Sequence, residues 1–484
     1  MSKRLQVALP DGLILLLLFL VPLAFFWPQT IGSKTLLPVD NLFGFQPHAA
    51  LAPEYGVQTP HNGLLSDLIL ENYPWKQFIR ESLTARQLPL WQPYIVGGTP
   101  FLAAGQSSAL YPFSAIFYVM PLAEAYGWFT VSQLWLAGAC MYLLARVLGV
   151  RRFGALMAAL AYQISGFMLV SVVFPMILAV AAWLPFLLAM VELTIRQGRA
   201  IGGRPATIPW VVLGAFGLGT AALAGHVEAL YFTLLVIGFY ALSRLLASLW
   251  VRRREPAIWR RLAARGLWLC AMVGIGLALG AVQLIPAYEL ASRSFREGAA
   301  SLAQVRGWAY PARRLIAFLI PNFFGNPAHH AYFDLFEWRM IPVAINAYGQ
   351  PITSTDWGIK NYVEGGAYLG LLPMALALVA LIDEIARRLK RPQQKANDGT
   401  LSGGVAERNE TDHSYRVIFA ILAVLSISFV FGTPTYALLY YGLPFVNQSH
   451  SPFRWVWPLT LSIAVLAGFG ADTLQRMWRP QSAD

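Results

Sequence analysis

The sequence predicts an all-α polytopic membrane protein, and three observations support this fold class. Hydrophobic residues make up 57% of the 484 positions and charged residues only 12%, with a mean hydropathy of +0.53; soluble domains carry about twice that charge density. Several apolar runs reach about 18 residues or more, enough to cross a bilayer as helices. Most basic residues lie in short loops between these runs, as membrane orientation requires.

About ten membrane helices are expected, because backbone groups in lipid must hydrogen-bond within their own segment. They cover approximately residues 12–31, 125–148, 153–172, 174–196, 208–224, 226–248, 266–289, 363–386, 416–432 and 453–475. The segment 110–121 is too short to span, and we expect it to be re-entrant or interfacial. The first run lacks a small-x-small cleavage site, so it is interpreted as a retained helix.

The basic loops set the expected orientation. With both termini in the cytoplasm, every strongly basic short loop lies on the cytoplasmic side. These loops contain Arg151 and Arg152, Arg196 to Arg204, Arg252 to Arg265, Arg387 to Lys395, and Arg476 with Arg479. The net charge of +12 therefore reflects topology and gives no indication of nucleic-acid binding. Cys140 and Cys270 lie inside apolar runs, so no disulfide framework is expected.

The whole chain, 1–484, is expected to form a single integral membrane domain with large outer loops after helix 1 (about 32–124) and helix 7 (about 290–362). A shorter outer loop covers residues 433–452, and the segment 387–415 is interpreted as a flexible cytoplasmic linker. Several arginines are expected on the outer side, contrary to the excess of basic residues on the cytoplasmic side. An anionic headgroup or phosphate is their natural partner. They are Arg293, Arg296, Arg306, Arg313, Arg314 and Arg454.

Two carboxylates in the first outer loop are candidate catalytic residues. Asp67 precedes an amphipathic run in which Ile69, Tyr73, Phe78 and Leu83 can share one face. A carboxylate beside a phosphate site can act as a general base toward an acceptor hydroxyl. The simpler alternatives are that Asp67 caps this helix and that Asp40 makes an Asx-turn.

Aromatic and ionisable residues supply the candidate substrate-binding positions. Tyr73 and Trp91 suit the face of a sugar ring, and equally an interfacial aromatic belt. His226 and Glu228 fall at an outer turn, and Glu364 begins the eighth helix; ionisable groups at membrane depth are costly, although helix ends let them reach water. No metal motif, P-loop or Ser/His/Asp arrangement is present.

Several motifs, taken in order, resemble the YfhO family of bacterial membrane proteins. In the first outer loop they are DLILENYP, LPLWQP, GGTP and ALYP, and later ones include GHVEALYF, LIPAYELASRSFR, YVEGGAYLG and SPFRW. The resemblance covers most of the chain, and that family in turn resembles GT-C glycosyltransferases. It implies a GT-C-like fold and a catalytic acid in the first outer loop, where Asp67 fits better than Asp40. It also implies that Arg454 and Arg293, with Arg296 nearby, contact phosphate.

The resulting hypothesis is a glycosyltransferase in the bacterial cytoplasmic membrane. Its donor would be a polyprenyl-phosphate sugar, and its acceptor an envelope glycan, lipid or polymer on the outer face. No cofactor is identified, and a divalent metal has no support because an Asp-x-Asp pair is absent. The alternatives are a transporter or flippase for a lipid-linked glycan, which Pro/Gly-interrupted helices would suit, and a non-catalytic scaffold for envelope assembly.

Overall fold

The computed structural model describes residues 3–57, 60, 65–196, 207–253, 255–293, 300–324, 331–334, 338–342, 366–397, 403–448 and 452–478. This part of the chain is helical apart from two short antiparallel hairpins. The strands are β1 (Trp91–Gln92) with β2 (Thr99–Pro100), and β3 (Ala331–Asp334) with β4 (Arg339–Pro342). Trp91 pairs with Pro100 and Ala331 with Pro342, which sets the two registers.

The apolar, candidate membrane-spanning segments lie in the helices of the bundle. They are α1 (Lys3–Phe25), α6 (Leu122–Val147), α7 (Arg152–Gln163), α9 (Pro175–Arg196), α10 (Ile208–Leu223), α11 (Val227–Arg252), α12 (Ile258–Leu279), α13 (Ala281–Ser292), α15 (Leu371–Asn397), α16 (Gly403–Val430) and α18 (Val456–Trp478). The short α-helices are α2 (Trp27–Thr30), α3 (Tyr73–Thr84), α4 (Phe101–Ala104), α5 (Ala115–Val119), α8 (Gly166–Val170), α14 (Leu302–Gly307) and α17 (Tyr436–Gly442). The 3-10 and π segments include η1 (Val39–Gly44), η2 (His48–Leu51), η4 (Leu68–Asn72), η5 (Pro112–Ser114), η6 (Ser171–Val173), η7 (Ala312–Phe318), η9 (Val446–Gln448) and η10 (Pro452–Trp455).

The predicted fold class is confirmed. Six helical segments of the described chain are long and apolar enough to cross a membrane. They are Leu122–Val147, Arg152–Val173, Pro175–Arg196, Val227–Arg252, Ile258–Leu279 and Pro452–Trp478. Three shorter apolar segments, Leu9–Phe25, Ile208–Leu223 and Ser414–Val430, match three more predicted spans. The tenth is α15, which begins at Leu371 and not near the predicted 363, and which carries charged side chains such as Asp383 and Arg387 from its middle onward.

The seventh predicted helix, 266–289, has different bounds in the structure. α12 begins eight residues earlier, at Ile258, and a break at Gly280 separates it from α13. α12 lies close against α10 here: a Cβ on Gly280 would lie 2.6 Å from that of Ala222, and one on Gly276 would lie 2.8 Å from that of Leu218. Small residues permit such close helix packing in membranes.

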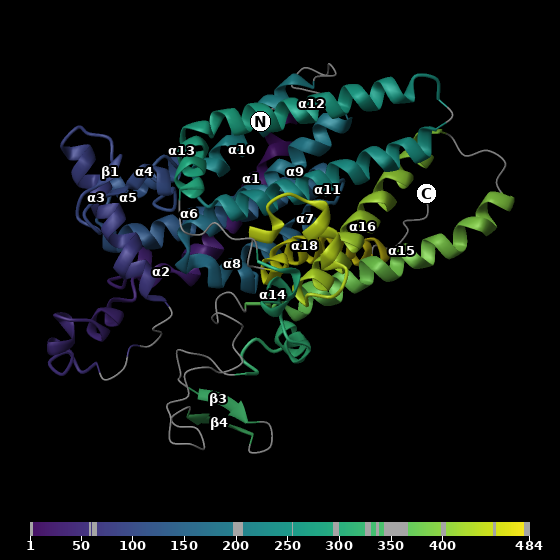
Figure 1. The fold of residues 1–484 in the computed structure, drawn as a ribbon. Helices are drawn as coiled ribbons and strands as arrows, with labels where there is room; N and C mark the ends of the chain where they lie inside the picture. The colour runs from purple at the N-terminus through teal and green to yellow at the C-terminus, as the bar shows by residue number, and fades with distance from the viewer. Residues whose placement is uncertain are drawn as a thin grey trace.

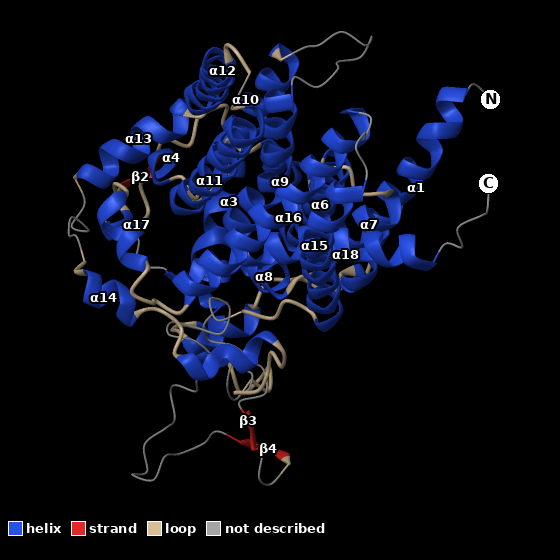
Figure 2. Cartoon of the chain, turned by 90° about the vertical axis from the view of Figure 1, so that its right-hand side faces the viewer, coloured by secondary structure: helices blue, strands red, loops and turns tan. Residues whose placement is uncertain are grey.

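Two helices form the centre of the bundle. In the most apolar stretches of the segments that include α18 and α9, 94% and 83% of the residues are buried. α18 packs against α7, α15 and α16, and α9 packs against α6, α10 and α11. In Figure 2, α7, α15 and α18 lie together, whereas α10 and α12 lie toward the opposite edge. This arrangement leaves the ends of α9, α11 and α18 near one another.

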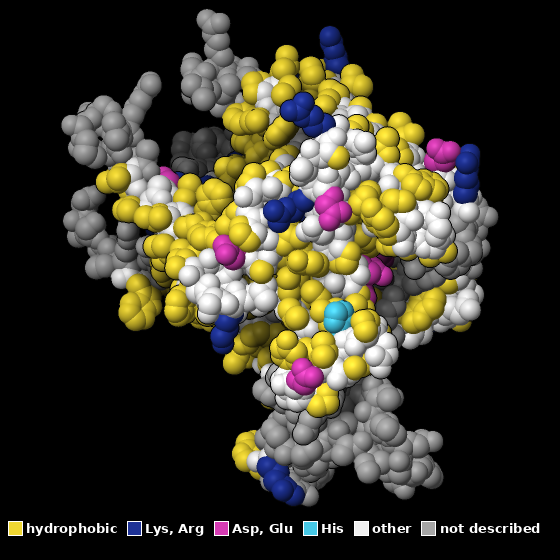
Figure 3. Space-filling view, turned by 90° about the vertical axis from the view of Figure 1, so that its left-hand side faces the viewer, with side chains coloured by type: hydrophobic (Ala, Val, Ile, Leu, Met, Phe, Trp, Pro, Cys, Tyr) yellow, Lys and Arg dark blue, Asp and Glu magenta, His cyan; other side chains and the backbone are white. Residues whose placement is uncertain are grey.

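The predicted first outer loop forms a folded cap at one end of the bundle. Its elements α3, α4, α5 and β1 gather there together with α13, whereas the C-terminal part of α15 lies at the other end (Figure 1). We call these the outer-loop end and the opposite end. Hydrophobic side chains interspersed with single charges cover the outer-loop face (Figure 3). Residues 110–121 form the short η5 and α5, and α15 and α16 extend into the segment 387–415.

Candidate functional site

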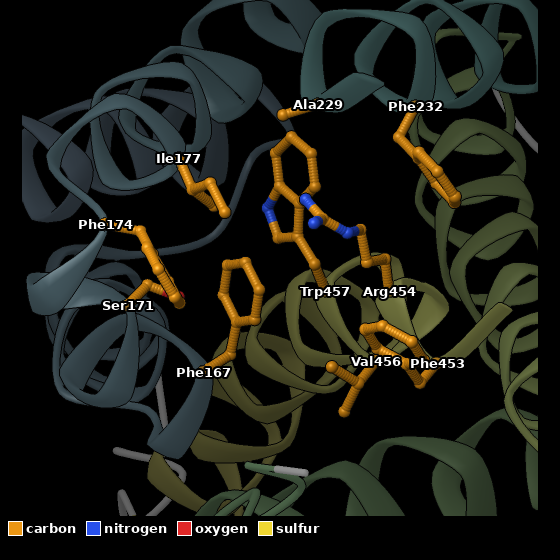
Figure 4. Close-up of a pocket in the computed structure, with 10 residues that line it drawn as sticks. All are labelled: Phe167, Ser171, Phe174, Ile177, Ala229, Phe232, Phe453, Arg454, Val456 and Trp457. Carbon is orange, nitrogen blue, oxygen red and sulfur yellow. The ribbon is translucent and has the colours of Figure 1, made fainter. Parts of the chain in front are cut away.

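An aromatic pocket opens among α8, α9, α11 and α18 at the outer-loop end. Its volume is about 490 Å³, counting the open mouth. Nine of the ten lining residues shown in Figure 4 are apolar or carry only a hydroxyl; they are Phe167, Ser171, Phe174, Ile177, Ala229, Phe232, Phe453, Val456 and Trp457. The tenth is Arg454, whose side chain extends from η10 toward Trp457 (Figure 4). The pocket therefore combines an apolar wall with a single cation.

Arg454 is held in place by Glu228 of α11, and the ring of His226 lies beside it. The Nε of Arg454 lies 3.3 Å from Oε2 of Glu228, and its Nη1 lies 3.3 Å from Nε2 of His226. The neighbouring Trp455 is clamped between the rings of Phe232 and Phe429, at centroid distances of 5.4 and 4.9 Å. These contacts fix η10, so the guanidinium is presented from a rigid base. Its side chain is 18% exposed, which leaves it reachable from the pocket mouth.

His226 presents a second hydrogen-bond donor beside Arg454. Its Nδ1 accepts a hydrogen bond from the backbone N–H of Ala229 at 3.1 Å and so caps α11. Burial, and then the charge of Arg454, lower the pKa of His226 to about 4. The ring is therefore neutral at pH 7, and with Nδ1 accepting, the proton resides on Nε2. An Nε2–H and a guanidinium nitrogen only 3.3 Å apart do not satisfy each other, so they favour an anion placed beside both of them.

The first outer loop is fastened to the turn that carries His226. Ser108 Oγ donates to the carbonyl of Ala224 at 2.7 Å. Gly105 and Gly225 approach so closely that a Cβ on Gly225 would lie 1.9 Å from the carbonyl oxygen of Gly105. Both glycines have positive φ angles, +78° and +85°, so only glycine is accommodated without strain. Residues 105–108 thus determine the position of the α10–α11 turn.

Lys76 anchors the same loop from the other side, and sequence reasoning missed it. Its side chain is 1% exposed, its Nζ donates to the carbonyl of Ser107 at 2.6 Å, and it lies 4.5 Å from the centroid of the Phe117 ring. Burial lowers the pKa of Lys76 to about 7. Of the residues expected on one interfacial face of this segment, Leu83 is exposed and Ile69 is buried.

The buried face of the segment is instead Asn72, Lys76 and Ile79. Their spacing of four and three residues is the helical signal that could have revealed this face. The polar identities of the first two concealed it, because an apolar-stripe search ignores Asn and Lys.

Asp67 is exposed at the start of the π-helical turn η4. Among the described residues it makes no side-chain capping hydrogen bond, so the expectation that it merely caps a helix is wrong. Burial, and then the charge of Asp67, raise the pKa of Glu71 one turn later. Asp40 is half-buried in η1. Neither Asp67 nor Asp40 lines the pocket that contains Arg454.

The remaining predicted site residues lie apart from the pocket or outside the described residues. Arg293 is 76% exposed and pairs with Glu289 at 3.0 Å. Trp91 is exposed on the β1–β2 hairpin, against Gly98, and Tyr73 is half-buried at the start of α3. Arg296 and Glu364 fall outside the described residues. The structure therefore brings together Arg454, His226 and Glu228 from the predicted set.

Among the described residues, no group of three His, Cys, Asp or Glu side chains is arranged to hold a metal ion.

Comparisons with known proteins yield structural matches alone. No family model matches the chain, and no curated protein matches it. A crystal structure of ArnT from Cupriavidus metallidurans in the apo state matches 83% of this chain and 72% of that chain, with 16% identity and a TM-score of 0.31. The crystal structure of ArnT from the same organism bound to undecaprenyl phosphate matches the same shares, with 14% identity and a TM-score of 0.29.

Proposed function

We propose that the chain is a membrane glycosyltransferase that moves a sugar from a polyprenyl-phosphate donor to a glycan, lipid or polymer acceptor at the outer face of the bacterial cytoplasmic membrane. The supporting observation is the placement of Arg454 and His226 beside an aromatic pocket. A donor of this class is an amphiphile with an anionic head. Its isoprenoid chain suits the apolar wall, and its phosphate suits the two donors.

In this proposal Arg454 stabilises the phosphate as the glycosidic bond breaks. A fixed cation is most effective there, because charge builds up on the leaving oxygen and no reorganisation is needed. Glu228 holds the guanidinium in place, and the neutral His226 adds its Nε2–H to the same anion. Arg293 has its own partner in Glu289 and is largely exposed, so the proposal relies on Arg454.

Asp67 is proposed as the base that accepts the proton of the acceptor hydroxyl. It is exposed on the outer loop and accessible to an acceptor from water. The neighbouring Glu71, whose pKa is raised, is the adjacent carboxyl most ready to hold a proton. The cap that bears both residues is tied to the His226 turn through Lys76, Ser107 and Ser108, which links the proposed base to the proposed phosphate site.

The test supplies a radiolabelled polyprenyl-phosphate sugar and an extract of envelope acceptors to the purified protein. We expect transfer by the wild type, none by Asp67→Asn, and a large loss with Arg454→Gln. Arg293→Gln is the matched control, since it removes an outer arginine away from the pocket. Wild-type transfer rates in Asp67→Asn would overturn the role of Asp67.

The same preparation in liposomes distinguishes the other functions. Movement of the lipid across the bilayer without transfer would indicate a flippase. Neither transfer nor movement would indicate a scaffold.

A further inference from the structure

A second arginine cluster lies at the opposite end of the bundle, at the α11–α12 connection. Glu255 lies between Arg252 and Arg261, with its Oε1 3.9 Å from Nε of Arg252 and its Oε2 2.8 Å from Nη1 of Arg261. The charges of Arg252 and Arg261 both act on Arg265. Glu255 thus contacts two guanidiniums, and its charge also acts on the third, that of Arg265. Arg244 also acts on Arg265 but is itself engaged by Glu192, 2.8 Å away.

Among the described residues, Arg265 is the member of this cluster that has a buried hydrogen-bond donor without an acceptor. Its Nε is buried, and within the described part of the chain no acceptor hydrogen-bonds to it. A buried N–H without an acceptor, beside like charges, is costly unless an anion completes it. The surroundings of Arg265 therefore call for a negatively charged ligand.

The sequence places this cation on the packed side of α12. Ile258, Leu269 and Met272 are buried. Arg261 and Arg265 fall between them at helical spacing, so the two guanidiniums share that side of α12. Arg260, one residue from Arg261, is exposed and lies on a different part of the helix surface. The position of Arg265 thus distinguishes it from an arginine that only sets topology.

Exposed aromatic rings surround the cluster. Trp250 at the end of α11 and Trp259 at the start of α12 are 74% and 70% exposed. The guanidinium of Arg253 lies 5.2 Å from the ring of Trp250. Tryptophan favours the headgroup level of a bilayer. Arginine beside exposed tryptophan at the end of two spanning helices is suited to a lipid headgroup rather than to a soluble anion.

We infer that Arg252, Arg261 and Arg265 form a binding site for the headgroup phosphate of an anionic phospholipid. The residues from Val227 to Arg252 form one continuous helix of 26 residues, so this site lies about 38 Å along α11 from the pocket. It is therefore separate from the proposed donor site, and it does not depend on the proposed function. Basic clusters at the ends of spanning helices are the usual binding sites for anionic lipids.

Native mass spectrometry of the full-length protein, titrated with phosphatidylglycerol or phosphatidylcholine, tests the inference. We expect the wild type to prefer phosphatidylglycerol, and Arg265→Gln to weaken its binding about fivefold. Arg260→Gln is the matched control, because it removes the same charge from the exposed surface of the same helix. It should leave the affinity for phosphatidylglycerol within about twofold of the wild type.

A gain-of-binding variant separates this site from a folding defect. Glu255→Gln removes the carboxylate that competes for the arginines, and we expect tighter binding of phosphatidylglycerol. The inference is overturned if the two phospholipids bind equally, if Arg260→Gln weakens binding as much as Arg265→Gln, or if Glu255→Gln leaves binding unchanged. Each of these outcomes can be read whether or not the protein transfers sugar.

Discussion

The two ends of the bundle each hold an arginine beside a glutamate, but the two pairs have different surroundings. At the opposite end, Glu192 is fully buried and receives the Nε of Arg244 at 2.8 Å and the hydroxyls of Tyr240 and Tyr415 at 2.8 and 2.5 Å. At the outer-loop end, Arg454 and Glu228 are partly exposed beside a pocket. The first group uses its hydrogen-bonding capacity to hold α9, α11 and α16 together, whereas the second directs charge toward open space.

The comparison teaches how to separate structural from functional arginines in a membrane protein. Residue type and an acidic neighbour do not suffice, because Arg244 and Arg454 are both arginines that contact a glutamate. The difference is what surrounds the guanidinium, which is a set of buried acceptors for Arg244 and a pocket for Arg454. Arg244 contacts Glu192, Ser414 and Tyr415, whereas Arg454 lies beside Glu228 and His226 and lines the pocket.

The largest expected effect comes from breaking the buried pair. Glu192→Ala should lower the free energy of unfolding by about 3–5 kcal/mol, because it leaves Arg244 buried without its counter-charge. Denaturant titration in detergent, followed by circular dichroism, measures this change. Glu228→Ala is the control at the other end and should cost less than about 1 kcal/mol. Equal losses in the two variants would contradict the proposed difference between the two ends.

Arg454 should show the reverse pattern. Arg454→Gln should reduce the proposed transfer by about 10²- to 10³-fold, as expected when a fixed transition-state partner is removed. Its unfolding free energy should stay within about 1 kcal/mol of the wild type, because the side chain is partly exposed. Transfer assays and denaturant titration on the same preparation check both halves. If the loss of activity is accounted for by unfolding of the variant, Arg454 belongs among the structural arginines.

Lys76→Met probes the link between the outer loop and the His226 turn. At pH 10, where the buried lysine is neutral, losing its hydrogen bond to the Ser107 carbonyl should cost about 0.5–1.5 kcal/mol.

The pH dependence of stability at Lys76 has a defined sign. Burial lowers the pKa of Lys76 from 10.5 to about 7. Between these values the unfolded chain binds one more proton, so wild-type stability should rise with pH by up to about 1.4 kcal/mol per unit. Denaturant titrations from pH 7 to pH 10 should show this rise in the wild type and a smaller one in Lys76→Met. Parallel pH profiles would exclude a buried lysine.

The smallest effect is expected at His226, where two substitutions separate capping from anion binding. His226→Ala removes the hydrogen bond to Ala229 and should cost about 1 kcal/mol. His226→Asn keeps a good capping acceptor, so stability should be retained. It also removes the Nε2–H, so the Michaelis constant for the donor should rise. Equal kinetics in His226→Asn and the wild type would remove His226 from the anion site.

The positions of the spanning helices could be read from the sequence, because each apolar run satisfies its own backbone hydrogen bonds. All ten predicted runs contain a helix. The main error is at 266–289, where the chain breaks at Gly280, a residue that lies close against Ala222 on a helix far away in the sequence.

The site was predicted in part. The motif SPFRW and the motif GHVEALYF singled out Arg454, His226 and Glu228, and the structure joins them through contacts of 3.3 Å. Arg293 was an equal candidate in the sequence, because nothing there showed that Glu289 pairs with it. Lys76 was not predicted, since its burial depends on Ser107 and Phe117 from a later segment.

The sequence by itself determined the class of protein and the approximate positions of its apolar helices, and it predicted their orientation. These are local properties, set by apolar length and by charge in short loops. Only the tertiary structure decided which charged residues are hydrogen-bonded inside the bundle and which line a pocket. That outcome depends on long-range partners, and partners brought together by packing leave no periodic signal in the chain.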